Sequence, residues 1–195
     1  MKKLLVSLLC LLALGVTTVS ADEIKLPEVT DHEKVTIYIF RGNGCGFCKK
    51  ALTYFNEVAD TYKDYFEVKT FEVWNNSNNS TLMNAVAEKM GDKLGGVPYI
   101  VIGDSYSENG FTDELGVQMV EKALEEYQNA KYKDLVAEVA KEHTDAKLMS
   151  LYDSCVEDGV IVLERDKSND AWIVLGIFAV IIGGGVALVM FSRKK

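Results

Sequence analysis

The chain is poor in the residues that bind metal ions. Only two histidines and four cysteines occur among its 195 residues. A structural zinc site needs about four Cys or His ligands. Beside the cysteine pair of the segment RGNGCGFCKK (residues 41–50), only Cys155, His32 and His143 offer further ligands, and each stands alone. The sequence therefore disfavours zinc. Copper(I) binding by two thiolates stays an alternative, although no methionine closely flanks the pair.

The chain also lacks an excess of positive charge. It carries 29 acidic and 21 basic residues, with a formal net charge of −8. An acidic protein is repelled by the phosphates of nucleic acids and by anionic lipid surfaces. We therefore expect no nucleic-acid partner.

Long apolar runs occur only near the two ends of the chain. Residues 1–21 begin with Lys2 and Lys3, continue through a short apolar run and finish on the small-residue pattern Val19-Ser20-Ala21. This order is typical of a secretory signal peptide that is cleaved near its last residue. A retained N-terminal anchor is the alternative.

The second apolar run, residues 171–191, is uncharged and long enough to cross a bilayer. Basic residues follow it in the stub 192–195, and such residues mark the cytoplasmic end of a span. The sequence predicts a single-pass plasma-membrane protein whose N-terminal domain is extracellular. We favour the bacterial cell surface. A eukaryotic secretory compartment is the alternative. In that setting the sequons at Asn75, Asn78 and Asn79 could carry N-linked glycans.

Between these ends, strand and helix patterns alternate. Residues 22–34 are polar and resemble a tether. Residues 35–128 predict an α/β domain, whereas residues 129–170 resemble a partly helical stalk. The expected elements of the domain are a buried strand at 35–40, a helix from residue 45, a strand at 66–74, a polar loop at 75–80, a helix at 81–94, a strand at 97–104, a short strand around 105–111 and a helix at 114–128.

The two cysteines of the first motif occupy chemically different positions. Cys45 is expected at a helix N-terminus, where free backbone N–H groups and the helix dipole stabilise a thiolate. Cys48 lies one turn further on, on the apolar stripe of the same helix. Cys45 is therefore suited to attack a disulfide, and Cys48 to resolve the mixed disulfide. A purely structural disulfide is the competing interpretation, although so small a loop constrains the unfolded chain little.

Two segments, VTIYIFRGNGCGFCKKALTYF and GGVPYIVIGD, together resemble the thioredoxin superfamily over roughly residues 30–128. The resemblance implies a thioredoxin-like fold, in which helices flank a central mixed sheet. It also implies a cis peptide bond before Pro98 and a role for the backbone of Val97 in binding an extended substrate peptide. Gly46 and Phe47, between the cysteines, are expected on the substrate side of the same site.

The sequence departs from thioredoxins proper at two positions. Gly44 stands where thioredoxins have a tryptophan before the first cysteine, and Ile39 stands where they have a buried aspartate. The Gly-Phe dipeptide between the cysteines is closer to the Gly-Tyr of bacterial disulfide isomerases and glutaredoxin-like proteins. The resemblance thus implies dithiol–disulfide exchange without fixing its direction, and it leaves the proton acceptor of the resolving thiol unnamed.

Taken together, these features predict a membrane-tethered extracytoplasmic thiol–disulfide oxidoreductase that needs no cofactor. Its substrates would be cysteine-containing secreted or surface proteins, and a separate redox partner would exchange electrons with it. The alternatives are a thioredoxin-like binding module with a structural disulfide and a copper(I) delivery protein. Cys155 is expected to be a quiet, partly buried thiol.

Overall fold

Two parallel strands form the middle of the sheet. They are β1 (Val35–Arg41) and β2 (Phe66–Glu72), which pair in register from Val35 opposite Phe66 to Arg41 opposite Glu72. Every residue of β1 is buried, as its β-branched and aromatic run predicts for a strand covered on both faces. The computed structural model describes residues 24 and 26–161. The predicted signal peptide, membrane span and cytoplasmic stub lie outside these residues.

Three further strands complete a mixed five-stranded sheet with the order β4-β3-β1-β2-β5. Each runs antiparallel to its inner neighbour. The three are β3 (Tyr99–Ile102), β4 (Tyr106–Asn109) and β5 (Leu148–Ser150). Strands β3 and β4 confirm the predicted strand and the short strand after it.

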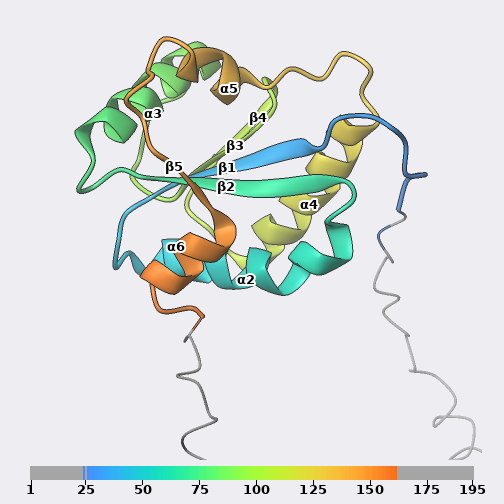
Figure 1. The fold of residues 1–195 in the computed structure, drawn as a ribbon, viewed down its shortest axis with the longest axis horizontal. Helices are drawn as coiled ribbons and strands as arrows, with labels where there is room; N and C mark the ends of the chain where they lie inside the picture. Colours follow the sequence, from blue (N-terminus) through green and yellow to red (C-terminus); the bar gives the residue numbers. More distant parts are fainter. Residues whose placement is uncertain (1–23, 25, 162–195) are drawn as a thin grey trace, which may run out of the picture.

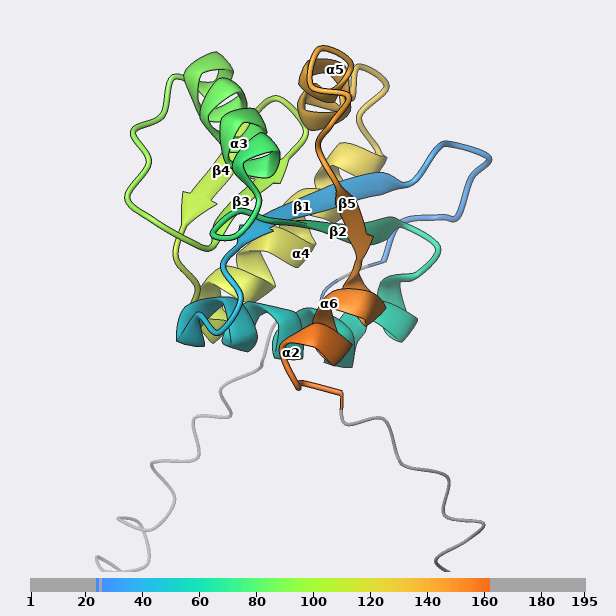
Figure 2. The same cartoon turned by 60° about the vertical axis from the view of Figure 1, so that its left-hand side comes forward.

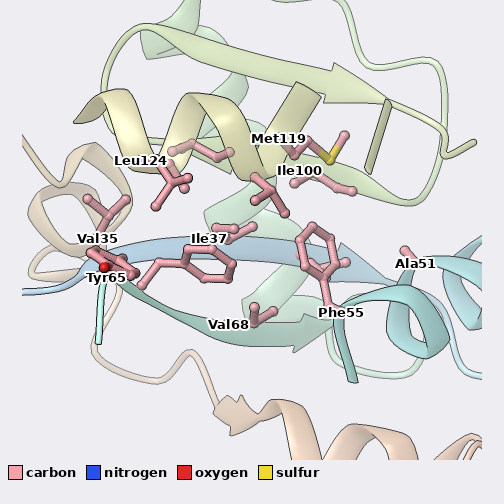
Figure 3. Close-up of a cluster of buried hydrophobic side chains, with 14 of the residues drawn as sticks. Val35, Ile37, Ala51, Phe55, Tyr65, Val68, Ile100, Met119 and Leu124 are labelled. Carbon is pink, nitrogen blue, oxygen red and sulfur yellow. The ribbon is translucent and has the colours of Figure 1, made fainter. Parts of the chain in front are cut away.

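Helices cover both faces of the sheet (Figures 1 and 2). On one face lie α2 (Gly46–Tyr62), α4 (Asp113–Tyr127) and α6 (Leu151–Glu157), and on the other lie α3 (Ser77–Met90) and α5 (Leu135–Ala140). Each face has its own apolar cluster. Figure 3 shows the first, which includes Ile37 of β1, Phe55 of α2 and Met119 of α4. The second joins Phe40 and Phe71 of the sheet to the apolar side of α3 and α5. This three-layer arrangement confirms the predicted thioredoxin-like α/β fold.

Helix α3 begins earlier than its sequence pattern predicts. The asparagine-rich segment was expected to be a loop up to residue 80, but the helix starts at Ser77. The side chain of Asn76 caps it by accepting hydrogen bonds from the backbone nitrogens of Asn78 and Asn79. Asn79 is buried, and its amide donates to the carbonyls of Glu72 and Lys147. Its side chain is therefore engaged in the fold.

The structure corrects the prediction of a stalk beginning at residue 129. Strand β5 pairs with β2, and α6 packs against α2. Ser154 of α6 shares a 2.6 Å hydrogen bond with Thr70 of β2, and the neighbouring Cys155 is fully buried. Both elements are short, so their sequence patterns are weak and their tertiary contacts define them. The domain extends past residue 128 to include both.

The segment predicted as a tether is fixed to the domain over part of its length. Residues 26–34 form no helix or strand. The hydroxyl of Tyr127, at the end of α4, nevertheless donates to the carbonyl of Thr30 and accepts from its backbone nitrogen, both at 2.9 Å. Tyr65 donates in the same way to the carbonyl of Pro27. This segment therefore packs on the domain rather than standing free of it.

No helix within the described residues combines the length and the apolar character needed to cross a bilayer.

Candidate active site

The turn between β1 and α2 places Cys45 at the start of a helix. Gly44 has a φ of +81°, in the left-handed region that glycine enters at low cost. The backbone nitrogen of Cys45 donates to the carbonyl of Gly42 at 3.1 Å and closes the turn. Cys45 is the N-cap residue of α2, as the sequence predicts for the first cysteine of the motif.

The two cysteines are joined by a disulfide, with their Cα atoms 5.2 Å apart. The Sγ of Cys45 also accepts a hydrogen bond of 3.1 Å from the backbone nitrogen of Cys48. Cys45 remains 8% exposed, whereas Cys48 is fully buried together with Leu52 and Phe55 on the inner side of α2. Both cysteines are therefore buried, and Cys45 is the less deeply buried of the two.

The segment before β3 forms the second wall of the site. The peptide bond between Val97 and Pro98 is cis, which confirms the prediction for this pair. The carbonyl oxygen of Val97 lies 3.7 Å from the Sγ of Cys45. Pro98 is buried, and its carbonyl accepts a hydrogen bond of 2.7 Å from the nitrogen of Gly110. The backbone of Val97 is thus held beside the Sγ of Cys45.

Gly46 and Phe47 lie on the exposed side of the first turn of α2. Phe47 is 59% exposed, and the ammonium group of Lys50 lies 5.6 Å from its ring centre. The structure therefore brings together all six residues predicted for the site: Cys45, Cys48, Val97, Pro98, Gly46 and Phe47.

An open groove of about 780 Å³ begins at Phe47 and runs between α2 and the start of α4. Tyr54 and Phe111 add aromatic surface to it, and these two residues were not predicted from the sequence. The charged residues along the groove have both signs: Lys49, Lys50, Glu57, Asp113 and Glu114.

A buried carboxylate, also missed from the sequence, holds the loop before Cys45. Glu72 at the end of β2 accepts hydrogen bonds from the backbone nitrogens of Asn43, Trp74 and Asn75. The indole of Trp74 covers Gly42 of the same loop so closely that a Cβ added there would overlap it. A charged residue ending a buried strand was the only sequence signal for Glu72.

A second buried group links the loop to α6. Arg41 is fully buried at the end of β1, and its guanidinium pairs with Glu157 and, at 2.7 Å, with Asp158. The other carboxylate oxygen of Asp158 accepts a hydrogen bond of 3.0 Å from the nitrogen of Gly44. Gly44 immediately precedes Cys45. The C-terminal end of α6 is therefore bonded to the turn that precedes Cys45.

Cys155, the third cysteine of the domain, is a free thiol buried in α6. Its Sγ lies 3.7 Å from the carbonyl oxygen of Leu52. Burial raises the pKa of the Cys155 thiol to about 11, and the negative charge of Asp158 adds to the rise while Arg41 opposes it. The thiol is therefore protonated at neutral pH and unreactive, in agreement with the expectation of a quiet cysteine.

Ile39 occupies the position at which thioredoxins have a buried aspartate. It is fully buried within the apolar cluster on the α2 face of the sheet. The carboxylates that bond to the loop before Cys45 come instead from the end of β2 and from the end of α6. Within residues 24 and 26–161, no three His, Cys, Asp or Glu side chains are placed to hold a metal ion.

A mixed sheet between helices, a disulfide at the N-terminus of the first helix and a cis-proline beside it define a thioredoxin-like redox protein. A family model described as Redoxin matches residues 16–140, which is more than half of the chain, so the chain belongs to the redoxin family. The comparison with curated proteins gives no match. Family and fold together indicate a thiol-based redox function that uses a cysteine pair.

Proposed function

We propose that the protein is a thiol–disulfide oxidoreductase that exchanges disulfides with cysteine-containing secreted or surface proteins. The proposal rests on the unequal exposure of the two linked sulfurs. Cys45 keeps 8% of its surface exposed and contacts the backbone of Val97, whereas Cys48 is fully buried. A purely structural disulfide has no need of this asymmetry, but a reaction in two steps does.

In the reductive direction, the thiolate of Cys45 attacks one sulfur of a substrate disulfide. A mixed disulfide forms between Cys45 and the substrate, and the second substrate sulfur leaves as a thiolate and takes a proton. Cys48 then loses its proton and attacks the Sγ of Cys45. The substrate leaves as a dithiol, and the enzyme keeps the Cys45–Cys48 disulfide, so two electrons pass to the substrate. The oxidative direction is the reverse sequence.

The geometry supports each role in this cycle. Because Cys45 is the N-cap residue, its Sγ accepts a hydrogen bond from the backbone nitrogen of Cys48. This bond favours the thiolate form of Cys45. The carbonyl of Val97 beside that sulfur offers an acceptor to an extended substrate chain. Phe47 and the groove next to it offer apolar surface for the residues that flank the substrate cysteine.

For the cellular setting, we propose an extracytoplasmic domain that residues 171–191 anchor to the plasma membrane, after cleavage of residues 1–21. The apolar runs of the sequence and the basic residues after the second run support this setting. A separate redox partner would then recycle the cysteine pair, since disulfides persist outside the cytosol.

The test is insulin reduction by dithiothreitol, catalysed by the full-length chain in a mild detergent. Wild type is expected to accelerate the reaction, and Cys45→Ser to remove the acceleration. Cys48→Ser should accumulate a mixed disulfide that reducing agents release. If wild type and Cys45→Ser behave alike, the proposal is wrong and the pair is a structural bridge. Stoichiometric copper(I) binding without disulfide exchange would favour metal delivery instead.

A further inference from the structure

The loop before the attacking cysteine carries a charged contact that neither the family nor the motif predicts. Asp158 is the C-cap residue of α6, and its side chain is only 3% exposed. One carboxylate oxygen accepts from the nitrogen of Gly44 and the other pairs with Arg41. Arg41 is the last residue of β1, and Gly44 lies in the loop that joins β1 to α2.

We propose that Asp158 is a positioning residue for Cys45: it fixes the turn through Gly44, and its charge, balanced by Arg41, sets how readily the cysteine pair is reduced. This inference deepens the proposed function and rests on it, since it assigns a residue to the same site. The two roles are separable, because a hydrogen-bond acceptor fixes the turn and only a charge acts on the redox equilibrium.

The positioning role follows from the turn itself. Gly44 holds a positive φ, and the bond from its nitrogen to Asp158 is the long-range contact that keeps this turn against α6. The next residue supplies the sulfur that caps α2. Loss of the acceptor would loosen the turn at the residue before the nucleophile, and small displacements of a reacting group are costly to rate.

The electrostatic role follows from burial. A carboxylate close to Cys45 opposes the formation of a thiolate there, and a guanidinium favours it. Arg41 is fully buried and shares its charge between Asp158 and the more exposed Glu157. Neutralising Asp158 alone leaves more of the positive charge of Arg41 uncompensated. The thiolate of Cys45 should then be more stable and the reduced form of the pair more favoured.

Other charged groups surround the loop and stay unchanged in the test. Glu72 accepts from Asn43 on the β2 side. The groove beside α2 adds five charged residues: Lys49, Lys50, Glu57, Asp113 and Glu114. The thiol of Cys155, on the α6 side, is protonated at neutral pH and adds no charge there.

The experiment compares Asp158→Asn with Asp158→Ala in the full-length chain. The asparagine retains an acceptor for Gly44 but removes the charge, whereas alanine removes both. Two readouts are measured: the pH dependence of Cys45 alkylation by iodoacetamide, located by mass spectrometry, and the reaction with glutathione, which is followed in time for the rate of disulfide exchange and to its end for the redox equilibrium. Asp153→Asn is the matched control, because it removes a charge from the exposed N-terminal turn of the same helix.

We expect Asp158→Asn to shift the glutathione equilibrium about tenfold toward the reduced protein, which corresponds to about 30 mV. The alkylation of Cys45 should move to lower pH in parallel. Asp158→Ala should show the same shift together with slower disulfide exchange. Asp153→Asn should match wild type in both readouts.

If Asp158→Asn matches wild type while Asp158→Ala does not, the charge has no role and this part of the proposal is overturned. If both match wild type, the positioning role falls as well.

Should Asp158→Asn fail to fold, Glu157→Gln serves instead, because it keeps the bond to Gly44 and removes the other carboxylate from Arg41. A shift in the same direction is then expected, and no shift would refute the charge role. Alkylation needs no catalysis, so its result can be read even if wild type reduces no insulin and the proposed function fails.

Discussion

The indole ring of Trp74 lies directly against the backbone of Gly42, in the loop that leads to Cys45. A Cβ built on Gly42 would overlap ring atoms of Trp74, whereas one built on Gly44 or Gly46 meets nothing within 4 Å. Trp74 itself is 59% exposed and can move toward solvent. The close approach therefore explains the glycine at position 42, and it makes Trp74 a reporter of the loop.

Gly42→Ala should push Trp74 away from the loop rather than unfold the domain. The expected cost is about 1 kcal/mol, or a fall in Tm of about 2–4 °C, because an exposed ring relieves the overlap cheaply. The fluorescence emission of Trp74 should shift to longer wavelength. This emission is obtained by subtracting the spectrum of a Trp74→Ala variant, in which only Trp172 remains. In that same background Gly42→Ala should cost almost nothing, since the ring is gone. An equal cost in both backgrounds would show that the overlap is not the cause.

Glu72→Gln should destabilise the loop that leads to Cys45. The carboxylate accepts three partly buried backbone N–H bonds, and the glutamine amide can present only one oxygen, so at least one donor loses its acceptor. The expected loss is about 1–3 kcal/mol of the free energy of unfolding. Urea denaturation measures it. Glu67→Gln is the control: its ion pair with Lys69 is surface-exposed and should be worth less than about 1 kcal/mol.

The strand before the motif and helix α2 could be predicted from local sequence, because an unbroken apolar run marks the strand and a helical stripe that includes Cys48 marks the helix. The cis bond before Pro98 was implied only by the resemblance to the thioredoxin superfamily. The roles of Glu72 and Asp158 could not be predicted in this way. Asp158 reaches Gly44 across a separation of 114 residues, and no periodicity encodes such a contact. For the same reason β5, which is three residues long, was interpreted as part of a stalk.

Tyr127→Phe should release the N-terminal segment from the domain. The hydroxyl exchanges two hydrogen bonds of 2.9 Å with the backbone of Thr30, and their loss should cost about 1–2 kcal/mol. Hydrogen exchange at the Thr30 amide should accelerate, and proteolysis within residues 26–34 should become faster. Tyr152→Phe, at an exposed site, should change neither measurement. Unaltered exchange at Thr30 in Tyr127→Phe would mean that other contacts hold the segment.

Cys155→Ala should remove a pH dependence of stability at alkaline pH. The pKa of Cys155 is about 11 in the fold, above its ordinary value near 9. Between these two values the unfolded chain has lost the thiol proton and the folded chain still holds it. The unfolded state then binds fewer protons, so stability falls as the pH rises. Below pH 9 both states keep the proton, and the full stability contributed by the neutral thiol is present.

Urea denaturation of wild type and Cys155→Ala, measured at several pH values from 8 to 11, isolates this effect. Tyrosines and lysines titrate in the same range, but they are common to both proteins and cancel in the difference. The substitution should cost stability at pH 8, because it removes a buried sulfur. The difference should then shrink as the pH approaches 11, since only wild type must keep a buried thiol protonated. A difference that stays constant over this range would show that Cys155 titrates alike in the folded and unfolded chain, contrary to its burial against Leu52.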